Sequence, residues 1–327
     1  MGLSDWAGRR VLVTGATGMV GSWLVKELLL EGAYVVALVL DLDPQSELVR
    51  SGDLERCAVV NGALEDFATL ERAINLHETD TVFHLGAQTI VEVAHRYPLA
   101  TWDANVRGTY NLLEACRTHA GLVERIVIAS SDKAYGEAET LPYTEESTLA
   151  ARHPYEVSKA CGDLIALSYH HTYGLPVSIA RCGNVFGGGD LNWSRIVPGT
   201  IRSLLREERP VLRSDGTFRR DYVYVKDAAQ AYVALADAVG RDGVAGEAFN
   251  FGNESPLTVL ELVDSIKRLM NCNGVEPLIE DRAVGEIKDQ WLSSAKARRR
   301  LDWAPRFDLD TALNETIDWY EGFLGRR

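Results

Sequence analysis

Several kinds of site are missing from the sequence, which has 327 residues. Its five cysteines lie far apart and form no C-x-x-C pair, a spacing that fits reduced and mostly buried thiols in a cytoplasmic protein. Its seven histidines include the neighbours His170 and His171 but no H-E-x-x-H or similar spacing of ligands. We therefore expect no bound metal, and we expect the protein to reside in the cytoplasm.

Positive charge is also scarce in this chain. Lys and Arg number 34 against 47 Asp and Glu, which gives a formal net charge of −13. This balance argues against a binder of nucleic acids or membrane surfaces, so an anionic ligand would need a local basic pocket. No apolar run approaches the ~20 residues that span a bilayer, and the opening stretch MGLSDWAGRR lacks the apolar core of a signal peptide. We expect neither nucleic acid nor a membrane as a partner.

Two kinds of apolar segment alternate along the first half of the chain. Some are short and nearly continuous in Val, Ile, Leu and Ala, as in strands that are covered on both faces. Others show the apolar spacing of helices. We predict strands at 10–16, 34–40, 57–60, 81–87, 125–130 and 176–182, and helices at 19–32, 67–77, 100–119 and 155–173. This order predicts a doubly wound α/β fold, in which helices cover both faces of a parallel Rossmann sheet.

The pattern changes after residue 182, where a glycine-rich stretch begins. Ser255 is expected to cap a helix over 255–270, with Pro256 in its first turn. Further helices are predicted near 198–208, 293–301 and 310–324, and a strand at 247–252. We predict a first domain over 1–182 and a smaller α/β lobe over 183–327. The two would be partly interleaved, because 222–239 could pack with the first domain.

The stretch TGATGMVG places Gly15, Gly18 and Gly21 between the first strand and the first helix. Glycine at this junction lets the backbone approach a pyrophosphate, which rests on amide groups and on the helix N-terminus. A tight turn with close helix packing would explain one or two of these glycines, but not all three. The pattern therefore predicts a dinucleotide site.

The choice of cofactor depends on the end of the second strand, where an acidic residue would bind the adenosine ribose. The usual position falls at Val39, and the first acid after it is Asp41. Asp41 could contact the ribose or could be an ordinary loop acid. No Arg or Lys that could hold a 2′-phosphate occurs between Tyr34 and Gln45, so the sequence favours NAD over NADP.

Tyr155 and Lys159 are four residues apart and so lie on one face of the predicted helix. Such a pair alone is weak evidence, but it means more downstream of a dinucleotide loop. Lys159 could bind the nicotinamide ribose, and its charge with that of the oxidised nicotinamide would lower the pKa of the Tyr155 phenol. The tyrosinate could then take a proton from a sugar hydroxyl.

These motifs together resemble an extended short-chain dehydrogenase/reductase of the sugar-nucleotide epimerase/dehydratase family. The resemblance rests on the glycine triplet, on Asn105 in NVRGTYNLLEA, on Ser131 ahead of Tyr-Gly, and on Tyr155 with Lys159. It continues through 181–190, 216–232 and 250–254. It implies a nucleotide-sugar substrate, a homodimer, an NAD site in the first domain and a substrate site in the second. Further cofactor contacts implied by it are Thr17, Met19, Val20, Leu64, Leu85, Ala87 and Cys182.

The residues after Ser131 distinguish two branches of this family. Members that only epimerise have small or uncharged residues there, whereas Ser131-Asp132-Lys133 resembles the CDP-glucose 4,6-dehydratases. Once C4 of the sugar is a ketone, Lys133 could remove the C5 proton, and a protonated Asp132 could deliver a proton to the departing C6 hydroxyl. The alternative is that Asp132 and Lys133 form an ordinary solvated turn.

Substrate contacts are expected from the second lobe. By resemblance, Asn184 lies at the sugar-phosphate region, and Arg220 binds the pyrophosphate, for which a guanidinium is well suited. Arg195 and Arg213 are further candidates and could equally be surface charges. The stretches RIVP and GGGD resemble the CDP-glucose enzymes, but RDYVYV resembles the wider family, so the nucleotide base stays open between CDP, GDP, dTDP and UDP.

The sequence thus predicts an NAD-dependent nucleotide-sugar 4,6-dehydratase. Tyr155 would be the base at O4, Lys159 its electrostatic partner and Ser131 a hydrogen-bond donor to O4. A 4-epimerase is the alternative, and it would leave Asp132 and Lys133 idle. A non-catalytic dinucleotide sensor on the same fold is a third reading, against which the intact pair of Tyr155 and Lys159 argues.

Overall fold

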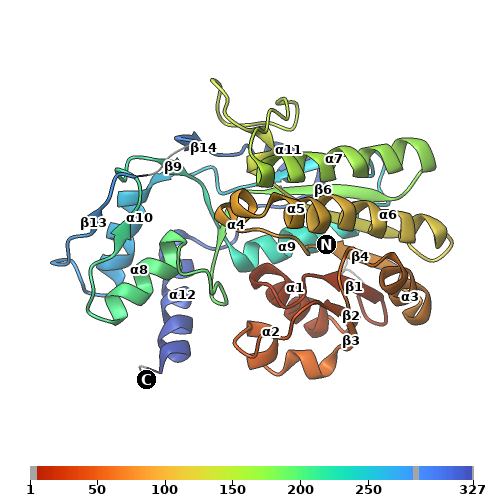
Figure 1. The fold of residues 1–327 in the computed structure, drawn as a ribbon, viewed down its shortest axis with the longest axis horizontal. Helices are drawn as coiled ribbons and strands as arrows, with labels where there is room; N and C mark the ends of the chain where they lie inside the picture. The colour runs from red at the N-terminus through yellow and green to blue at the C-terminus, as the bar shows by residue number, and fades with distance from the viewer. Residues whose placement is uncertain (1–5, 283–286, 326–327) are drawn as a thin grey trace.

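A computed structural model describes residues 6–282 and 287–325. The first five residues of the opening stretch, where no signal peptide is expected, lie outside this range. The core is a seven-stranded parallel sheet with the order β11-β6-β5-β4-β1-β2-β3 (Figure 1). Its strands are β1 (Arg10–Thr14), β2 (Tyr34–Val39), β3 (Ala58–Asn61), β4 (Thr81–His84), β5 (Arg125–Ser131), β6 (Val177–Cys182) and β11 (Ala248–Phe251). The predicted doubly wound fold is confirmed.

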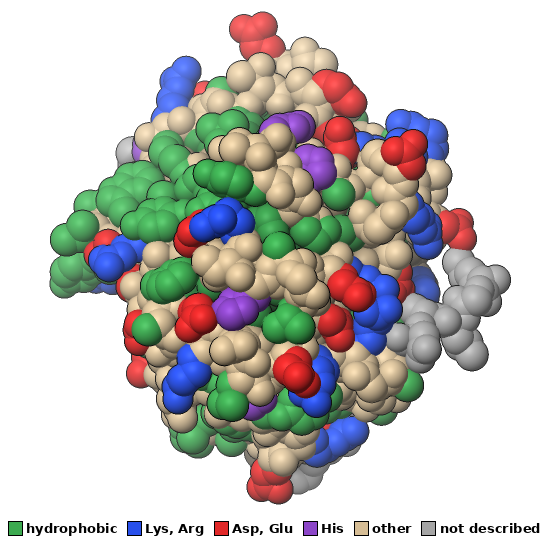
Figure 2. Space-filling model, turned by 90° about the vertical axis from the view of Figure 1, so that its right-hand side faces the viewer, with side chains coloured by type: hydrophobic (Ala, Val, Ile, Leu, Met, Phe, Trp, Pro, Cys, Tyr) green, Lys and Arg blue, Asp and Glu red, His purple; other side chains and the backbone are tan. Residues whose placement is uncertain are grey.

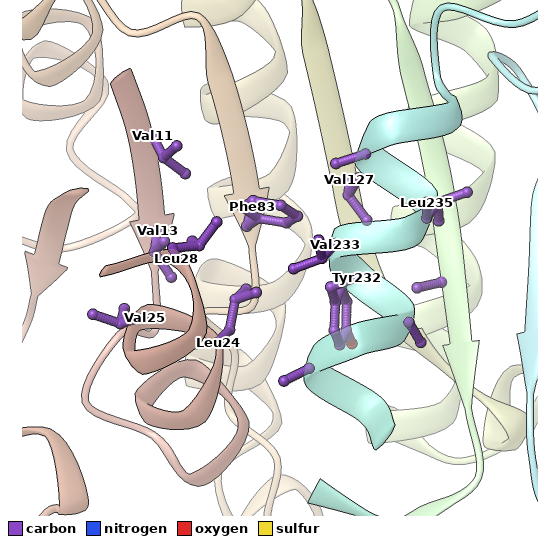
Figure 3. Packing of buried hydrophobic residues seen from close by; sticks show 14 of the residues in the cluster. Val11, Val13, Leu24, Val25, Leu28, Phe83, Val127, Tyr232, Val233 and Leu235 are labelled. Carbon is purple, nitrogen blue, oxygen red and sulfur yellow. The ribbon is translucent and has the colours of Figure 1, made fainter. Parts of the chain in front are cut away.

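Helices cover both faces of this sheet because successive strand residues point to opposite sides. On β1, Val11 and Val13 face one layer and Leu12 faces the other. The first layer contains α1 (Met19–Leu30) and α9 (Val225–Ala238), whose side chains meet those of the strands in Figure 3. The second contains α3 (Phe67–His77), α6 (Gly108–Thr118) and α7 (Pro154–Tyr173).

The second half of the chain returns to the sheet twice. The helix α9 packs against α1, β5 and β6, and β11 adds the edge strand beside β6. Both elements lie beyond residue 182, so the two halves of the chain are interleaved.

A smaller lobe lies to the left of the sheet in Figure 1, around its own apolar cluster. Its helices are α8 (Ile196–Leu205), α10 (Val259–Leu269) and α12 (Leu309–Leu324), while α11 (Ala295–Leu301) packs against β11 and α9. Its short strands are β7 (Asn184–Phe186), β8 (Val211–Leu212), β9 (Arg219–Arg220), β10 (Tyr222–Tyr224), β12 (Leu257–Thr258), β13 (Leu278–Ile279) and β14 (Asp289–Gln290).

The prediction that 100–119 forms one regular α-helix is wrong. The chain runs through α5 (Pro98–Thr101), a wider π-helical turn η2 (Trp102–Arg107) and then α6. Turns of this kind occur often at functional sites. The remaining short elements, which sequence reasoning missed, are α2 (Glu47–Arg50), η1 (Asp53–Arg56), α4 (Val91–Arg96) and η3 (Asp132–Tyr135).

The predicted start of the helix over 255–270 is also wrong. The helix α10 begins at Val259, because Leu257 and Thr258 form a strand that pairs with β9. Thr258 then caps the helix: its hydroxyl accepts from the Glu261 amide at 3.1 Å, and the Glu261 carboxylate accepts from the Thr258 amide at 2.7 Å. Thr258 is therefore the N-cap in place of Ser255, and the reciprocal capping box satisfies the amides of Thr258 and Glu261.

We expect Thr258→Ala to lower the free energy of unfolding by about 1 kcal/mol, because the substitution removes one side of the capping box. Ser255→Ala, which lies outside the helix, is the matched control and should change little. Urea denaturation of both variants measures the difference. An equal or larger loss in the Ser255 variant would contradict the observed helix start.

Candidate active site

The candidate site lies where parallel strands end side by side. The strands β1, β4, β5 and β6 run in the same direction, so the loops that follow them meet at one edge of the sheet. The strand order reverses between β1 and β4, the place where doubly wound sheets bind nucleotides. These loops bring together the glycine triplet, 85–87, Ser131 to Lys133, and 182–184.

The three glycines have different roles. Gly15 has a positive φ of 67°, and a Cβ there would lie 2.7 Å from the Gly86 amide nitrogen. A Cβ on Gly21 would lie 2.1 Å from the Gly15 carbonyl oxygen, so both glycines are needed for close packing. Gly18 is exposed and precedes α1, and a Cβ there would meet only the Gly15 carbonyl oxygen, at 3.2 Å. Gly18 therefore leaves the N-terminus of α1 open to an anion.

The other proposed cofactor contacts surround this opening to different degrees. Thr17, Met19 and Val20 adjoin Gly18 and are half-buried. Asp41 is exposed in the loop after β2. The side chain of Leu64 lies against Gly86 and Gly108, with Leu85 and Ala87 in the same half-buried region, and Cys182 is buried at the end of β6.

Asn105 connects three segments of the chain through its side-chain hydrogen bonds. Its Nδ2 donates to the Ser158 hydroxyl at 2.8 Å and to the Gln88 carbonyl at 3.0 Å, and its Oδ1 accepts from the Gln88 amide at 2.7 Å. The side chain thereby ties η2 to α7 and to the loop after β4. It also lines a small pocket with Ala87 and Lys159.

Tyr155 and Lys159 lie on α7, where Tyr155 is buried and Lys159 is half-buried. Burial lowers the pKa of the Lys159 ammonium to about 8, and its Nζ donates to the Ala129 carbonyl at 3.0 Å. Burial raises the pKa of the Tyr155 phenol to about 12, and the charge of Arg195 opposes this rise. The lowering expected from the sequence therefore depends on the positive charge of a bound cofactor.

Asp132 and Lys133 form an ion pair in η3, directly behind Ser131. The Asp132 carboxylate is 1% exposed and accepts on Oδ1 from the Ser131 hydroxyl at 2.9 Å and from Lys133 Nζ at 3.3 Å. Lys133 Nζ also donates to the Asn184 side-chain oxygen at 3.1 Å. These contacts differ from those of a solvated surface turn, because each charged group has protein partners.

The four residues that were predicted to bind the substrate have different partners, and only one of them contacts the pair of Asp132 and Lys133. Asn184 contacts Lys133, and its buried Nδ2 has no hydrogen-bond partner among the described residues. Arg195 pairs with Asp190 at 3.2 Å, and its charge acts on Tyr155. Arg213 pairs instead with Glu92 on α4. Arg220 donates to the main-chain carbonyls of 287 and 288.

Two further residues lie at the site, and sequence reasoning missed one of them, Gln290. His84 ends β4, as expected of a residue with a local hydrogen bond, and is buried between the hydroxyls of Thr14 and Thr109, at 2.8 and 3.0 Å. Burial lowers the pKa of His84 to about 3, so its ring is neutral and unsuited to act as a base near pH 7. Gln290 donates from Nε2 to the Asp132 carbonyl at 3.1 Å. No local pattern relates Gln290 to Asp132, because 158 positions separate them.

The described residues contain no group of three or more His, Cys, Asp or Glu that could hold a metal ion. No helix within the described ranges is both long and apolar enough to cross a membrane.

The fold and the site define a dinucleotide-binding enzyme class of the extended short-chain dehydrogenase type. A profile of the NAD dependent epimerase/dehydratase family matches residues 11–252, and the chain belongs to this family. The predicted family and the prediction of NAD as its cofactor are thereby confirmed.

Known relatives include both dehydratases and epimerases. The chain is 30% identical to the CDP-glucose 4,6-dehydratase of Salmonella typhimurium, over 98% of this chain and 92% of that protein. The dTDP-glucose 4,6-dehydratase of Streptomyces venezuelae, solved with NAD bound, superposes with a TM-score of 0.87 at 28% identity, covering 97% of this chain and 98% of that one. An epimerase of Methanothermobacter thermautotrophicus superposes with a TM-score of 0.89 at 28% identity, covering 98% and 94%.

We expect Gly18→Val to abolish cofactor binding while the protein stays folded, because its side chain fills the opening at α1 rather than the packed turn. Gly21→Val is the contrasting variant and should fail to fold. Dinucleotide released from denatured wild type should be NAD(H), and none should be released from Gly18→Val. Recovery of mostly NADP(H), or of normal amounts from the variant, would contradict this assignment.

Proposed function

We propose that the protein is an NAD-dependent nucleotide-sugar 4,6-dehydratase. The observation that carries the proposal is the ion pair of the buried Asp132 and the half-buried Lys133, beside Ser131 and Asn184. A dehydratase needs a further acid and base for the elimination of water. An epimerase has no elimination step and so needs no such pair. The dehydratases among the relatives support this choice.

The first step oxidises the sugar at C4, with loss of a hydride from C4 and of the proton from its hydroxyl. NAD, which the open N-terminus of α1 and Lys159 on α7 would hold, would supply hydride acceptance and later hydride return. Tyr155 takes the proton of the O4 hydroxyl, and Ser131 donates a hydrogen bond to O4. Lys159 binds the nicotinamide ribose and stabilises the tyrosinate by its charge.

The second step eliminates water across C5 and C6. The ketone at C4 makes the C5 proton acidic, and the amine of Lys133 removes it. Asp132 delivers a proton to the C6 hydroxyl as the C6–O bond breaks, which leaves a double bond between C5 and C6. The hydrogen bond between Lys133 Nζ and Asp132 Oδ1 joins the two proton-transfer groups directly.

The nucleotide diphosphate binds in the second lobe, over 183–327, and the cofactor in the first domain, over 1–182. Arg220 binds the diphosphate, and Asn184 offers its unpartnered Nδ2 to the sugar phosphate. Arg195 adds positive charge near Tyr155. Arg213 becomes available to the substrate only when it leaves Glu92. We place CDP-glucose first among the substrates, because the CDP-glucose enzyme is a relative along 98% of this chain.

Removal of either member of the pair should block only the second step. Asp132→Asn loses the transferable proton, and Lys133→Met loses the amine but keeps the apolar stem. With CDP-glucose, dTDP-glucose, UDP-glucose and GDP-glucose as substrates, we expect both variants to form reduced cofactor, seen by absorbance. Loss of water, read by mass, should slow at least ~100-fold.

Tyr155→Phe is the matched control, because it should prevent reduction of the cofactor as well as loss of water. A 4-epimerase would behave differently: the wild type would give an isomer of unchanged mass, and the Asp132 and Lys133 variants would do nearly the same. Failure of the wild type to release water from any of the four substrates would overturn the proposed reaction.

We also propose that the protein is a homodimer in the cytoplasm. Large apolar side chains on neighbouring helices are exposed, among them Leu99 on α5, Tyr110 on α6 and Leu164 on α7. A second copy would cover such a surface, and the family resemblance supports this arrangement. Figure 2 shows hydrophobic side chains gathered along the left edge of its view. The five free cysteines support a reducing compartment.

Leu164→Glu should halve the molar mass measured by light scattering, because it places a charge in the proposed interface. Leu30→Glu is the matched control: Leu30 is 72% exposed against 60% for Leu164, but it ends α1 in the opposite helical layer. A monomeric wild type, or equal effects of the two variants, would contradict the proposed interface.

A further inference from the structure

Gln290 reaches from the second lobe to the turn that carries the proposed acid and base. It is 1% exposed, and its Nε2 donates to the main-chain carbonyl of Asp132 at 3.1 Å. The Asp132 side chain on the same residue accepts from Ser131 and Lys133. A buried hydrogen bond of this kind holds its acceptor more firmly than an exposed one, since no water replaces it.

The strand that carries Gln290 is fixed on both sides. On one side, Gln290 pairs with Arg220 of β9 in a parallel register, and the Arg220 guanidinium donates to the Lys288 carbonyl at 2.7 Å. On the other side, the Trp291 carbonyl accepts from the Tyr143 amide at 3.0 Å. Gln290 therefore acts from a rigid support that also carries the proposed diphosphate contact.

We propose that Gln290 is a positioning residue for the elimination step, and this rests on the proposed dehydratase function. By fixing the Asp132 backbone, Gln290 directs Asp132 and Lys133 toward C6 and C5 of the sugar. Tyr155 and Lys159 lie on α7, which Gln290 does not contact through any hydrogen bond among the described residues. The first step should therefore proceed normally without Gln290, while the elimination slows.

Gln290→Met is the test variant, because it keeps the length of the side chain and removes the donor. With CDP-glucose and dTDP-glucose, reduced cofactor should form at a rate within about twofold of the wild type. Loss of water should slow about 10- to 100-fold at an unchanged KM, as expected when reacting groups are misplaced. Gln230→Met is the matched control, since its amide bonds Glu27 on α1, away from the site.

Hydrogen exchange supplies a second measurement that needs neither cofactor nor substrate. Backbone amides in 132–136 should exchange faster in Gln290→Met than in the wild type or Gln230→Met, at an unchanged Tm. Unchanged exchange, or equal slowing of both steps together with a lower Tm, would overturn the positioning role while the dehydratase stands. A wild type that releases no water from either substrate would overturn the dehydratase and the role of Gln290 in elimination together.

Discussion

Arg181 joins, in the interior of the protein, the helix that carries Tyr155 and Lys159 to the turn that carries Asp132 and Lys133. Its Nε donates to Asp163 of α7 at 2.7 Å, and its Nη1 donates to the hydroxyl of Tyr135 in η3 at 2.7 Å. The Arg181 and Asp163 side chains are 5% and 0% exposed. Removing one partner of such a pair costs about 3–5 kcal/mol, because the other charge stays buried alone. The ion pair of Arg181 and Asp163 therefore fixes the position of α7, with Tyr155 and Lys159, relative to η3, with Asp132 and Lys133.

The same network reaches further into the second half of the chain. Tyr135 donates to Asn250 of β11 at 2.7 Å, and Asn250 donates to the Tyr143 carbonyl at 3.2 Å. Tyr143 in turn pairs with the segment around Leu292. The turn η3 is thus held from the sheet by Arg181 and from the second lobe by Gln290. This explains how two adjacent charged residues can keep one orientation at the end of a strand.

Burial sets the protonation of the site before any ligand binds. It lowers the pKa of Lys159 to about 8 and raises that of Tyr155 to about 12, so both groups favour their neutral forms more than they would in water. In a buried environment an added positive charge acts strongly on a nearby phenol. The burial that keeps Tyr155 protonated in the free protein therefore also makes it sensitive to the charge of a bound cofactor.

The sequence by itself determined the features that depend on neighbours along the chain. Continuous apolar runs indicate buried parallel strands, three glycines at the first turn indicate a phosphate site, and the spacing of Tyr155 and Lys159 places them on one helix. Only the tertiary structure decided contacts between distant segments, such as Gln290 with Asp132, Arg213 with Glu92, and β11 beside β6. It also moved the start of α10 to Val259, with Thr258 as its cap, because strand pairing with β9 outweighed the local preference for Ser255 and Pro256. These outcomes depend on strand order and lobe packing, and no short sequence pattern encodes either of them.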